Sequence, residues 1–139
     1  MNENRISWDL YALKIAQIAA LRSEDPFKKV GACALDFSNR VVGVAYNGLA
    51  SGINAPEKFW KDRDARRPFM IHAEINLLSL IKRGECKLLA CTLLPCSSCA
   101  SAIAAYGVKK VVYNEVYSRD NMALKIFEFN GIECKQLSL

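Results

Sequence analysis

The 139-residue sequence lacks the features that would place it in several large classes of protein. It has no apolar run approaching the roughly 20 residues of a membrane-spanning helix, so we expect no membrane partner. Seven glycines and four prolines are too few for a low-complexity or linker-rich chain. No apolar core of a secretory signal follows the first five residues. These absences predict one globular domain over residues 1–139 that functions in the cytoplasm.

Charge of one sign is not concentrated in any segment. The net charge is +5, from 19 Lys and Arg against 14 Asp and Glu, and no block of five like charges occurs. This mild excess favours anionic partners, and phosphorylated metabolites suit it as well as nucleic acid does. A solvated basic surface explains most of these charges equally well.

Alternating helical and extended patterns predict an α/β domain. Apolar residues recur at three- and four-residue spacing from Trp8 to about Arg22, which predicts an amphipathic helix. Residues 30–37 and 41–46 are rich in β-forming side chains and flank a turn, so they predict an antiparallel hairpin. Further helices are predicted at 71–82, 95–106 and 120–129, and further strands at 88–94, 108–113 and 132–137. This order predicts a three-layer α/β/α domain with a five-stranded mixed sheet.

Residues 47–69 have little periodicity and form the longest predicted connection. A connection of this length in a compact domain is usually functional or carries a short helix of its own. Its cations are partly offset by acidic neighbours, and they are Lys58, Lys61, Arg63, Arg66 and Arg67. They indicate either a solvated helix or a surface that binds phosphate or another subunit.

Histidine occurs once, and its context suggests a metal site. His72 begins a predicted helix and is followed two residues later by Glu74. Cys96 and Cys99 follow Pro95 and lie on one face of another predicted helix, because they are three residues apart. Both groups lie at helix N-termini, where the helix dipole favours thiolate. Three such ligands with a nearby carboxylate suit a catalytic zinc that keeps its fourth position for water.

Each of these motifs alone has another interpretation. A single histidine on a helix is usually not a ligand, and a single C-x-x-C is redox-active or fortuitous. A structural zinc would need a fourth ligand, for which Glu74 is the nearest residue. Together, however, the motifs match the H-x-E…P-C-x-x-C signature of zinc-dependent deaminases. The four other cysteines fit small buried side chains in a reducing compartment better than disulfides, and they are Cys33, Cys86, Cys91 and Cys134.

Nearly the whole chain resembles the cytidine deaminase superfamily, and within it the deoxycytidylate (dCMP) deaminases. The resembling segments are W-D-x-Y at 8–11, S-E-D-P at 23–26, V-G-A at 30–32, Y-N-G at 46–48, H-A-E-I-N at 72–76, L-P-C-S-S-C-A at 94–100 and G-V-K-K-V at 107–111. Asn76 and the Y-N-G segment favour the nucleotide branch. Ala50 departs from the family, which commonly has proline at that position.

The resemblance implies a cytidine deaminase-like fold and zinc-dependent hydrolysis of dCMP to dUMP and ammonia, which supplies thymidylate synthesis. It implies one Zn²⁺ held by His72, Cys96 and Cys99, with Glu74 as the unligated proton shuttle. The predicted substrate-binding residues are Asn47 for the sugar 3′-hydroxyl or base, Ala73 and Tyr117 beside the base or sugar, and Ser23 and Lys29 for the 5′-phosphate. An exposed loop tyrosine is an equally good interpretation of Tyr117.

The resemblance also implies regulation. Related enzymes are activated by dCTP and inhibited by dTTP, are commonly homo-hexamers, and would bind the triphosphate together with Mg²⁺. The predicted effector-binding residues are Gly48, Gly52, Lys58, Arg63, Arg66 and Arg67. The long connection has no Cys or His, so we do not expect the second, structural zinc that some relatives hold there.

Three rival functions compete with dCMP deamination. A tRNA adenosine deaminase shares the zinc motif but needs a broad basic face, and Y-N-G and Asn76 disfavour it, so we expect no nucleic acid partner. A free cytidine deaminase usually has Cys at the position of His72. A non-catalytic zinc-stabilised module would have no use for Glu74.

Overall fold

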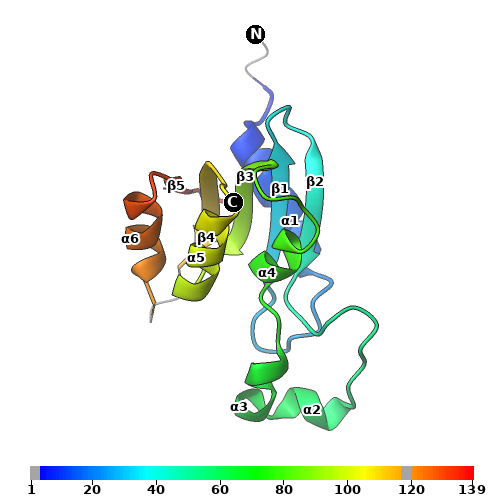
Figure 1. The fold of residues 1–139 in the computed structure, drawn as a ribbon. Helices are drawn as coiled ribbons and strands as arrows, with labels where there is room; N and C mark the ends of the chain where they lie inside the picture. The colour runs from blue at the N-terminus through cyan, green and yellow to red at the C-terminus, as the bar shows by residue number, and fades with distance from the viewer. Residues whose placement is uncertain (1–3, 117–119) are drawn as a thin grey trace.

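Five strands form one mixed sheet in the order β2-β1-β3-β4-β5 in the computed structural model, which describes residues 4–116 and 120–139 (Figure 1). The strands are β1 (Gly31–Asp36), β2 (Val41–Tyr46), β3 (Cys86–Leu93), β4 (Lys110–Glu115) and β5 (Glu133–Gln136). β1 is antiparallel to both β2 and β3, whereas β3, β4 and β5 are mutually parallel along the sheet. The predicted mixed sheet is confirmed, and β3 lies in its middle.

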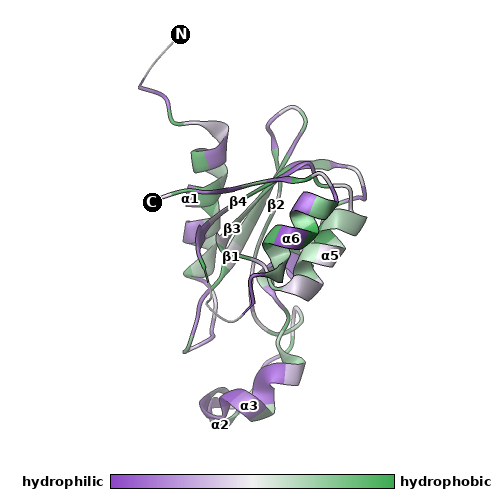
Figure 2. Ribbon diagram, turned by 90° about the vertical axis from the view of Figure 1, so that its left-hand side faces the viewer, coloured by the Kyte–Doolittle hydropathy of each residue, from purple (hydrophilic) through white to green (hydrophobic). Residues whose placement is uncertain are grey.

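Helices cover both faces of the sheet, which confirms the three-layer architecture (Figure 2). α1 (Trp8–Ala20) buries Leu13 and Ala16 against Val112 and other residues of one face. α4 (Ala73–Leu78), α5 (Ser97–Ala105) and α6 (Met122–Phe129) pack on the opposite face and contribute apolar side chains to a second, larger core. Among the described residues, none of the helices has the length and apolar character that crossing a bilayer would require.

The long connection after β2 carries three short helical segments, as its length led us to expect. These are α2 (Glu57–Lys61), α3 (Arg63–Arg66) and the 3-10 helix η1 (Arg67–Phe69), and we call residues 57–69 the helical arm. The arm projects beyond one end of the sheet in both views (Figures 1 and 2). Its base is closed by Gly48 and Ile71, whose backbone amides bond to each other's carbonyls at 3.0 and 2.7 Å.

Several predicted helix boundaries were wrong. α4 begins at Ala73 rather than at residue 71, and α6 begins at Met122 rather than at residue 120. α4 ends at Leu78 instead of continuing to residue 82, because the chain changes there to i→i+3 bonds and Gly84 takes a positive φ of 86°. α5 begins at Ser97, so Pro95 lies two residues ahead of the helix rather than at its first position. The connection between β3 and α5 is therefore residues 94–96, and it places Cys96 near the carboxyl end of β3.

Candidate active site

The carboxyl end of β3 and the starts of α4 and α5 bring three metal-binding side chains together. His72 is the N-cap residue of α4, and Cys96 is the N-cap residue of α5, with Cys99 in its first turn. The His72 Nδ1 atom lies 3.2 Å from the Cys99 Sγ and 3.5 Å from the Cys96 Sγ. All three donor atoms lie within 4.8 Å of one another. In the part of the chain that the structure describes, no other group of three His, Cys, Asp or Glu side chains is close enough to hold an ion.

These separations fit the donor set of a tetrahedral zinc site. Zinc–sulfur bonds of about 2.3 Å and zinc–nitrogen bonds of about 2.0–2.1 Å at tetrahedral angles place nitrogen and sulfur donors roughly 3.6 Å apart. The observed N–S distances of 3.2 and 3.5 Å are close to that separation. Two thiolates and an imidazole are also the soft and borderline ligands that zinc prefers. The residues present therefore fit this ion.

The three donor side chains shift one another's pKa. Hydrogen bonds from Cys99 and His72 lower the pKa of the Cys96 thiol to about 4. The same contact with Cys96, together with burial, raises the pKa of Cys99 well above its usual range. The hydrogen bond to Cys96 also raises the pKa of His72. A divalent cation at this point favours thiolate at both cysteines, so metal binding would release a proton.

Glu74 is the buried carboxylate of the site. It lies in the first turn of α4, is only 4% exposed, and lines the same cavity as His72 and Cys96. Burial raises the pKa of its carboxyl above the ordinary value, and the neighbouring His72 opposes that rise. A carboxyl group that is desolvated beside a metal-binding cluster is well placed to exchange protons.

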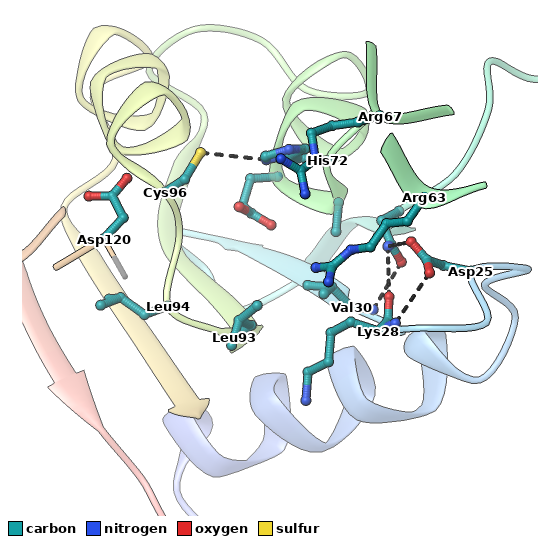
Figure 3. Close-up of a pocket in the computed structure, with 13 residues that line it drawn as sticks. Asp25, Lys28, Val30, Arg63, Arg67, His72, Leu93, Leu94, Cys96 and Asp120 are labelled. Carbon is teal, nitrogen blue, oxygen red and sulfur yellow. Dashed lines mark hydrogen bonds between the residues drawn. The ribbon is translucent and has the colours of Figure 1, made fainter. Parts of the chain in front are cut away.

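The cavity has a volume of about 390 Å³ and extends beyond the metal-binding side chains (Figure 3). Its lining includes three cations, Lys28, Arg63 and Arg67. In Figure 3, Lys28 and Arg63 lie on the side of Asp25, away from Cys96. The lining also includes Ala73, which is almost fully buried. One cavity thus joins a metal-binding end to a cationic side.

Asn47 lies in the cavity wall, but its amide group organises the turn before β1. Its Oδ1 accepts from the Val30 amide at 2.9 Å, and its Nδ2 donates to the Lys28 carbonyl at 3.0 Å. Its own carbonyl accepts from the Ser23 hydroxyl at 2.9 Å. The side chain of Asn76 likewise ties two segments, because it donates to the Tyr46 carbonyl at 2.9 Å.

The predicted phosphate ligands are not the ones that the structure brings to the cavity. Ser23 is 3% exposed, bonds to the backbone, and is absent from the cavity lining. Lys29 also lies outside the lining and donates to the Ser23 carbonyl. Its neighbour Lys28 lines the cavity instead. No signal in the sequence separates these two adjacent lysines, because the direction of each side chain depends on the folded turn.

The predicted effector residues separate into groups. Arg66 is 2% exposed and forms a salt bridge with Asp25, so we remove it from the effector prediction. Arg63 and Arg67 line the cavity, whereas Lys58 is an exposed residue of α2 outside it. Gly48 and Gly52 lie in the connection before the helical arm, and Gly52 has a φ of 82°. Tyr117, predicted to contact the substrate, lies outside the described residues.

Asp120 lines the cavity, although the sequence indicated only that a helix begins there. One carboxylate oxygen accepts from the Met122 amide at 3.1 Å, and the other accepts from the Ser97 amide at 3.0 Å. Ser97 directly follows Cys96, so Asp120 fixes the backbone beside a metal-binding residue. These bonds hold the pKa of Asp120 below its usual value. The N-cap residue of α6 is Asn121, one residue later than the sequence indicated, and the sequence gives no sign that the start of α5 lies within reach of Asp120.

Comparison with known proteins agrees with this geometry. Residues 6–115 match the family described as the cytidine and deoxycytidylate deaminase zinc-binding region. The chain belongs to this family. Human deoxycytidylate deaminase is 30% identical over 120 residues, which are 80% of this chain and 66% of that protein. The Saccharomyces cerevisiae deoxycytidylate deaminase is 33% identical, with 96% of this chain and 46% of that protein covered. The chain therefore spans less than two thirds of these family members' length.

Two further relatives match over more of their own length. ComE operon protein 2 of Bacillus subtilis is 32% identical over 140 residues, covering 97% of this chain and 74% of that protein. The crystal structure of the dCMP deaminase from the cyanophage S-TIM5 in apo form superimposes with a TM-score of 0.76 and 25% identity, covering 99% and 100% of the two chains. The same phage enzyme in complex with dCMP and dUMP gives a TM-score of 0.70 at 25% identity over 94% and 93%. The cytidine deaminase-like fold expected from the motifs is thereby confirmed.

Proposed function

We propose that this chain catalyses the zinc-dependent hydrolytic deamination of dCMP to dUMP and ammonia. The observation that carries the proposal is the composition of a single cavity. Its metal-binding end holds His72, Cys96 and the buried Glu74, and its lining also includes Arg63 and Arg67. A pyrimidine nucleoside monophosphate carries both matching parts, an amino-substituted ring and an anionic phosphate. The phage structure in complex with dCMP and dUMP supports the same choice.

Each residue of the metal-binding end has a separate role in the proposed reaction. His72, Cys96 and Cys99 would hold a zinc ion, which would supply an activated water as the nucleophile near neutral pH. Glu74 would take a proton from the attacking water and pass it to N3 of cytosine, and would then take the remaining proton of the new C4 hydroxyl and pass it to the amino group, which leaves as ammonia. The burial of Glu74 suits this role, because a raised pKa lets a carboxyl group both accept and return a proton near neutral pH.

The cations of the cavity would hold the 5′-phosphate. Arg63 and Arg67 present planar guanidinium groups, whose paired N–H donors match phosphate oxygens. Lys28 adds a third cation, which also forms a salt bridge with Glu115. Binding energy from a phosphate distant from the reacting atom can be used to orient C4 toward the nucleophile.

A deamination assay tests this function. Ammonia release should be fast with dCMP and at least tenfold lower in kcat/KM with deoxycytidine, because a charge-assisted hydrogen bond contributes about 1.5–3 kcal/mol. Glu74→Gln should retain zinc and lose at least about 10³-fold in kcat. Equal kcat/KM for the two substrates would refute the monophosphate preference. Ammonia release from an adenosine-containing tRNA substrate alone would favour the tRNA deaminase alternative, and zinc binding without turnover of any substrate would favour the non-catalytic module.

The proposal includes control by nucleotides in a cytoplasmic homo-oligomer, a hexamer by family resemblance. The segment that includes Gly48, Gly52 and Lys58 would hold dCTP or dTTP with Mg²⁺, and binding would shift an equilibrium between two states of the oligomer. Activity against dCMP concentration should change from sigmoidal to hyperbolic with dCTP and fall with dTTP. Hyperbolic kinetics indifferent to both nucleotides would refute this control, which Ala50 in place of proline would weaken by making the loop less rigid.

A further inference from the structure

A buried ion pair joins the helical arm to the turn that precedes β1. Arg66 of α3 donates from Nη1 to the Asp25 Oδ2 at 3.1 Å and from Nη2 to the Asp25 Oδ1 at 3.0 Å. The Arg66 residue is 2% exposed and Asp25 is 9% exposed, so both are buried. The two residues are 41 positions apart in the sequence. This bidentate contact fixes both the distance and the relative orientation of the two segments.

The acidic partner also fixes the backbone that carries Lys28. The Asp25 Oδ1 accepts from the amides of Phe27 and Lys28 at 2.8 and 3.2 Å. The Asp25 carboxylate is therefore shared between Arg66 and the turn. Any movement of Arg66 relative to this turn would change the position of Lys28 in the cavity wall.

The basic partner shares an aromatic ring with an arginine of the cavity. The Arg66 guanidinium carbon lies 5.1 Å from the centroid of the Phe27 ring and 5.7 Å from that of Trp60. The Arg63 guanidinium carbon lies 5.3 Å from the same Phe27 centroid. Arg63 and Arg66, both on α3, thus contact the same Phe27 ring. A shift of one guanidinium group against this ring would therefore affect the packing of the other.

The arrangement has an energetic cost that an apolar contact would avoid. Burying an ion pair loses hydration that its Coulomb attraction does not always restore, and apolar side chains of similar volume often stabilise a fold as well or better. In addition, the Arg66 Nε is buried and finds no hydrogen-bond partner among the described residues. What a bidentate pair provides beyond an apolar contact is a defined geometry.

We propose that the Asp25–Arg66 pair is a positioning device that sets the preference of the cavity for a phosphorylated substrate. Asp25 fixes the turn that carries Lys28, and Arg66 shares the Phe27 ring with Arg63, so the pair links the placement of two cations of the cavity. Arg66 and Asp25 act through these neighbours and do not contact the substrate. The inference rests on the proposed dCMP deaminase activity and deepens it, because it assigns phosphate selectivity to residues outside the reacting centre.

Arg66→Lys tests the proposal, because it keeps the charge but loses the planar fork. We expect kcat/KM for dCMP to fall at least tenfold and kcat/KM for deoxycytidine to change less than threefold. Calorimetry on the zinc-loaded protein should show the same difference in affinity: Arg66→Lys should weaken binding of dUMP at least tenfold and change binding of deoxyuridine less than threefold. Phe27→Leu, which removes the shared ring and leaves the ion pair in place, should shift the same ratio by about threefold or more. Lys61→Gln is the matched control on the arm, because the ion pair of Lys61 within the described residues is with Glu57 at 3.9 Å, on an exposed surface.

The outcomes separate this inference from the proposed function. If the wild-type protein does not deaminate dCMP, the proposed function fails and this inference fails with it. If it deaminates dCMP and deoxycytidine equally well, dCMP deamination stands, but the monophosphate preference and this inference are both overturned. If the wild type prefers dCMP and both variants keep its ratio of dCMP to deoxycytidine, the positioning role alone is overturned. A parallel fall with both substrates, with the melting temperature lowered, also overturns it, because a purely structural pair would act on stability. Should Arg66→Lys fail to fold, Phe27→Leu decides the question by the same ratio.

Discussion

A methyl group at Gly31 should separate α1 from the sheet. A Cβ atom built at this position would lie 1.9 Å from the Ala16 carbonyl oxygen and 2.6 Å from the Ala20 amide nitrogen. Both neighbours are backbone atoms of α1, so no side-chain rotation relieves the contact. Gly31→Ala therefore requires the helix and the start of β1 to move apart by about 1 Å, from 1.9 Å to the 3.0 Å that real Cβ contacts respect.

The cost follows from what such a movement does to packing. The helix buries Ala12, Leu13 and Ala16 completely against the sheet. A gap of about 0.5–1 Å forfeits a quarter to a half of the dispersion attraction of the atoms that face it. Overpacking in a rigid core typically costs about 1–3 kcal/mol, and here neither contacting segment is a flexible side chain, so we expect at least about 3 kcal/mol. For a domain of this size that is a fall of roughly 10 °C or more in melting temperature.

Thermal unfolding of the zinc-loaded protein, followed by circular dichroism, measures the effect. Gly48→Ala is the control, because a Cβ atom there meets nothing within 4 Å. It should melt within about 3 °C of the wild type, as expected of a substitution that costs less than 1 kcal/mol. A Gly31→Ala protein that melts within the same 3 °C would refute the packing argument.

Three further predictions concern the site. Metal analysis should find one zinc per chain, and the double variant Cys96→Ser/Cys99→Ser should lose it; retention of zinc would refute the ligand set. Asp120→Ala should lower kcat about tenfold while zinc remains bound, with a smaller loss in Asp120→Asn, because the carboxylate fixes the Ser97 amide beside Cys96; an unchanged kcat would refute this role. Burial raises the pKa of Asp25, but hydrogen bonds from Arg66 and two backbone amides outweigh it and hold that pKa below the ordinary value of 3.8. Because the folded-state pKa is the lower one, the stability contributed by Asp25 is present above about pH 4 and is lost as the pH falls through the folded-state pKa. The free energy of unfolding of Asp25→Asn should therefore fall less steeply with acid than that of the wild type. The same fall in both proteins would contradict this contribution.

Local sequence patterns predicted the strands that form the sheet. The β-forming residues of 30–37 and the apolar run of 88–94 predicted strands, and β1 and β3 form there because strands at the centre of a sheet bury side chains on both faces. The ligand positions were also predictable, since His72, Cys96 and Cys99 owe their placement to helix starts that flanking residues mark. Helix ends were predicted less well, because α4 ends where tertiary contacts and a glycine turn replace the helical pattern.

The substrate side of the cavity was not predictable in the same way. Ser23 and Lys29 are suitable residue types for a phosphate, but the turn that contains them directs Lys28 into the cavity wall. The direction depends on hydrogen bonds from residues far along the chain, including the Asn47 side chain that accepts from the Val30 amide. A sequence pattern reports the chemistry of a side chain, whereas its direction in an irregular turn is fixed by partners that only the fold brings near.

The same reasoning explains why several polar residues near the predicted site form hydrogen bonds that hold the loops in place. A cavity that must present cations at a defined distance from a metal needs irregular segments held as firmly as strands. Asp25, Asn47 and Arg66 satisfy this requirement, because each bonds to a segment at least 17 residues away from its own. Residues that match a substrate-binding motif therefore include Asn47, whose side chain forms hydrogen bonds that hold the turn before β1 in place. For this chain, we therefore expect that substitutions of residues that do not contact the phosphate can still lower the selectivity for a phosphorylated substrate.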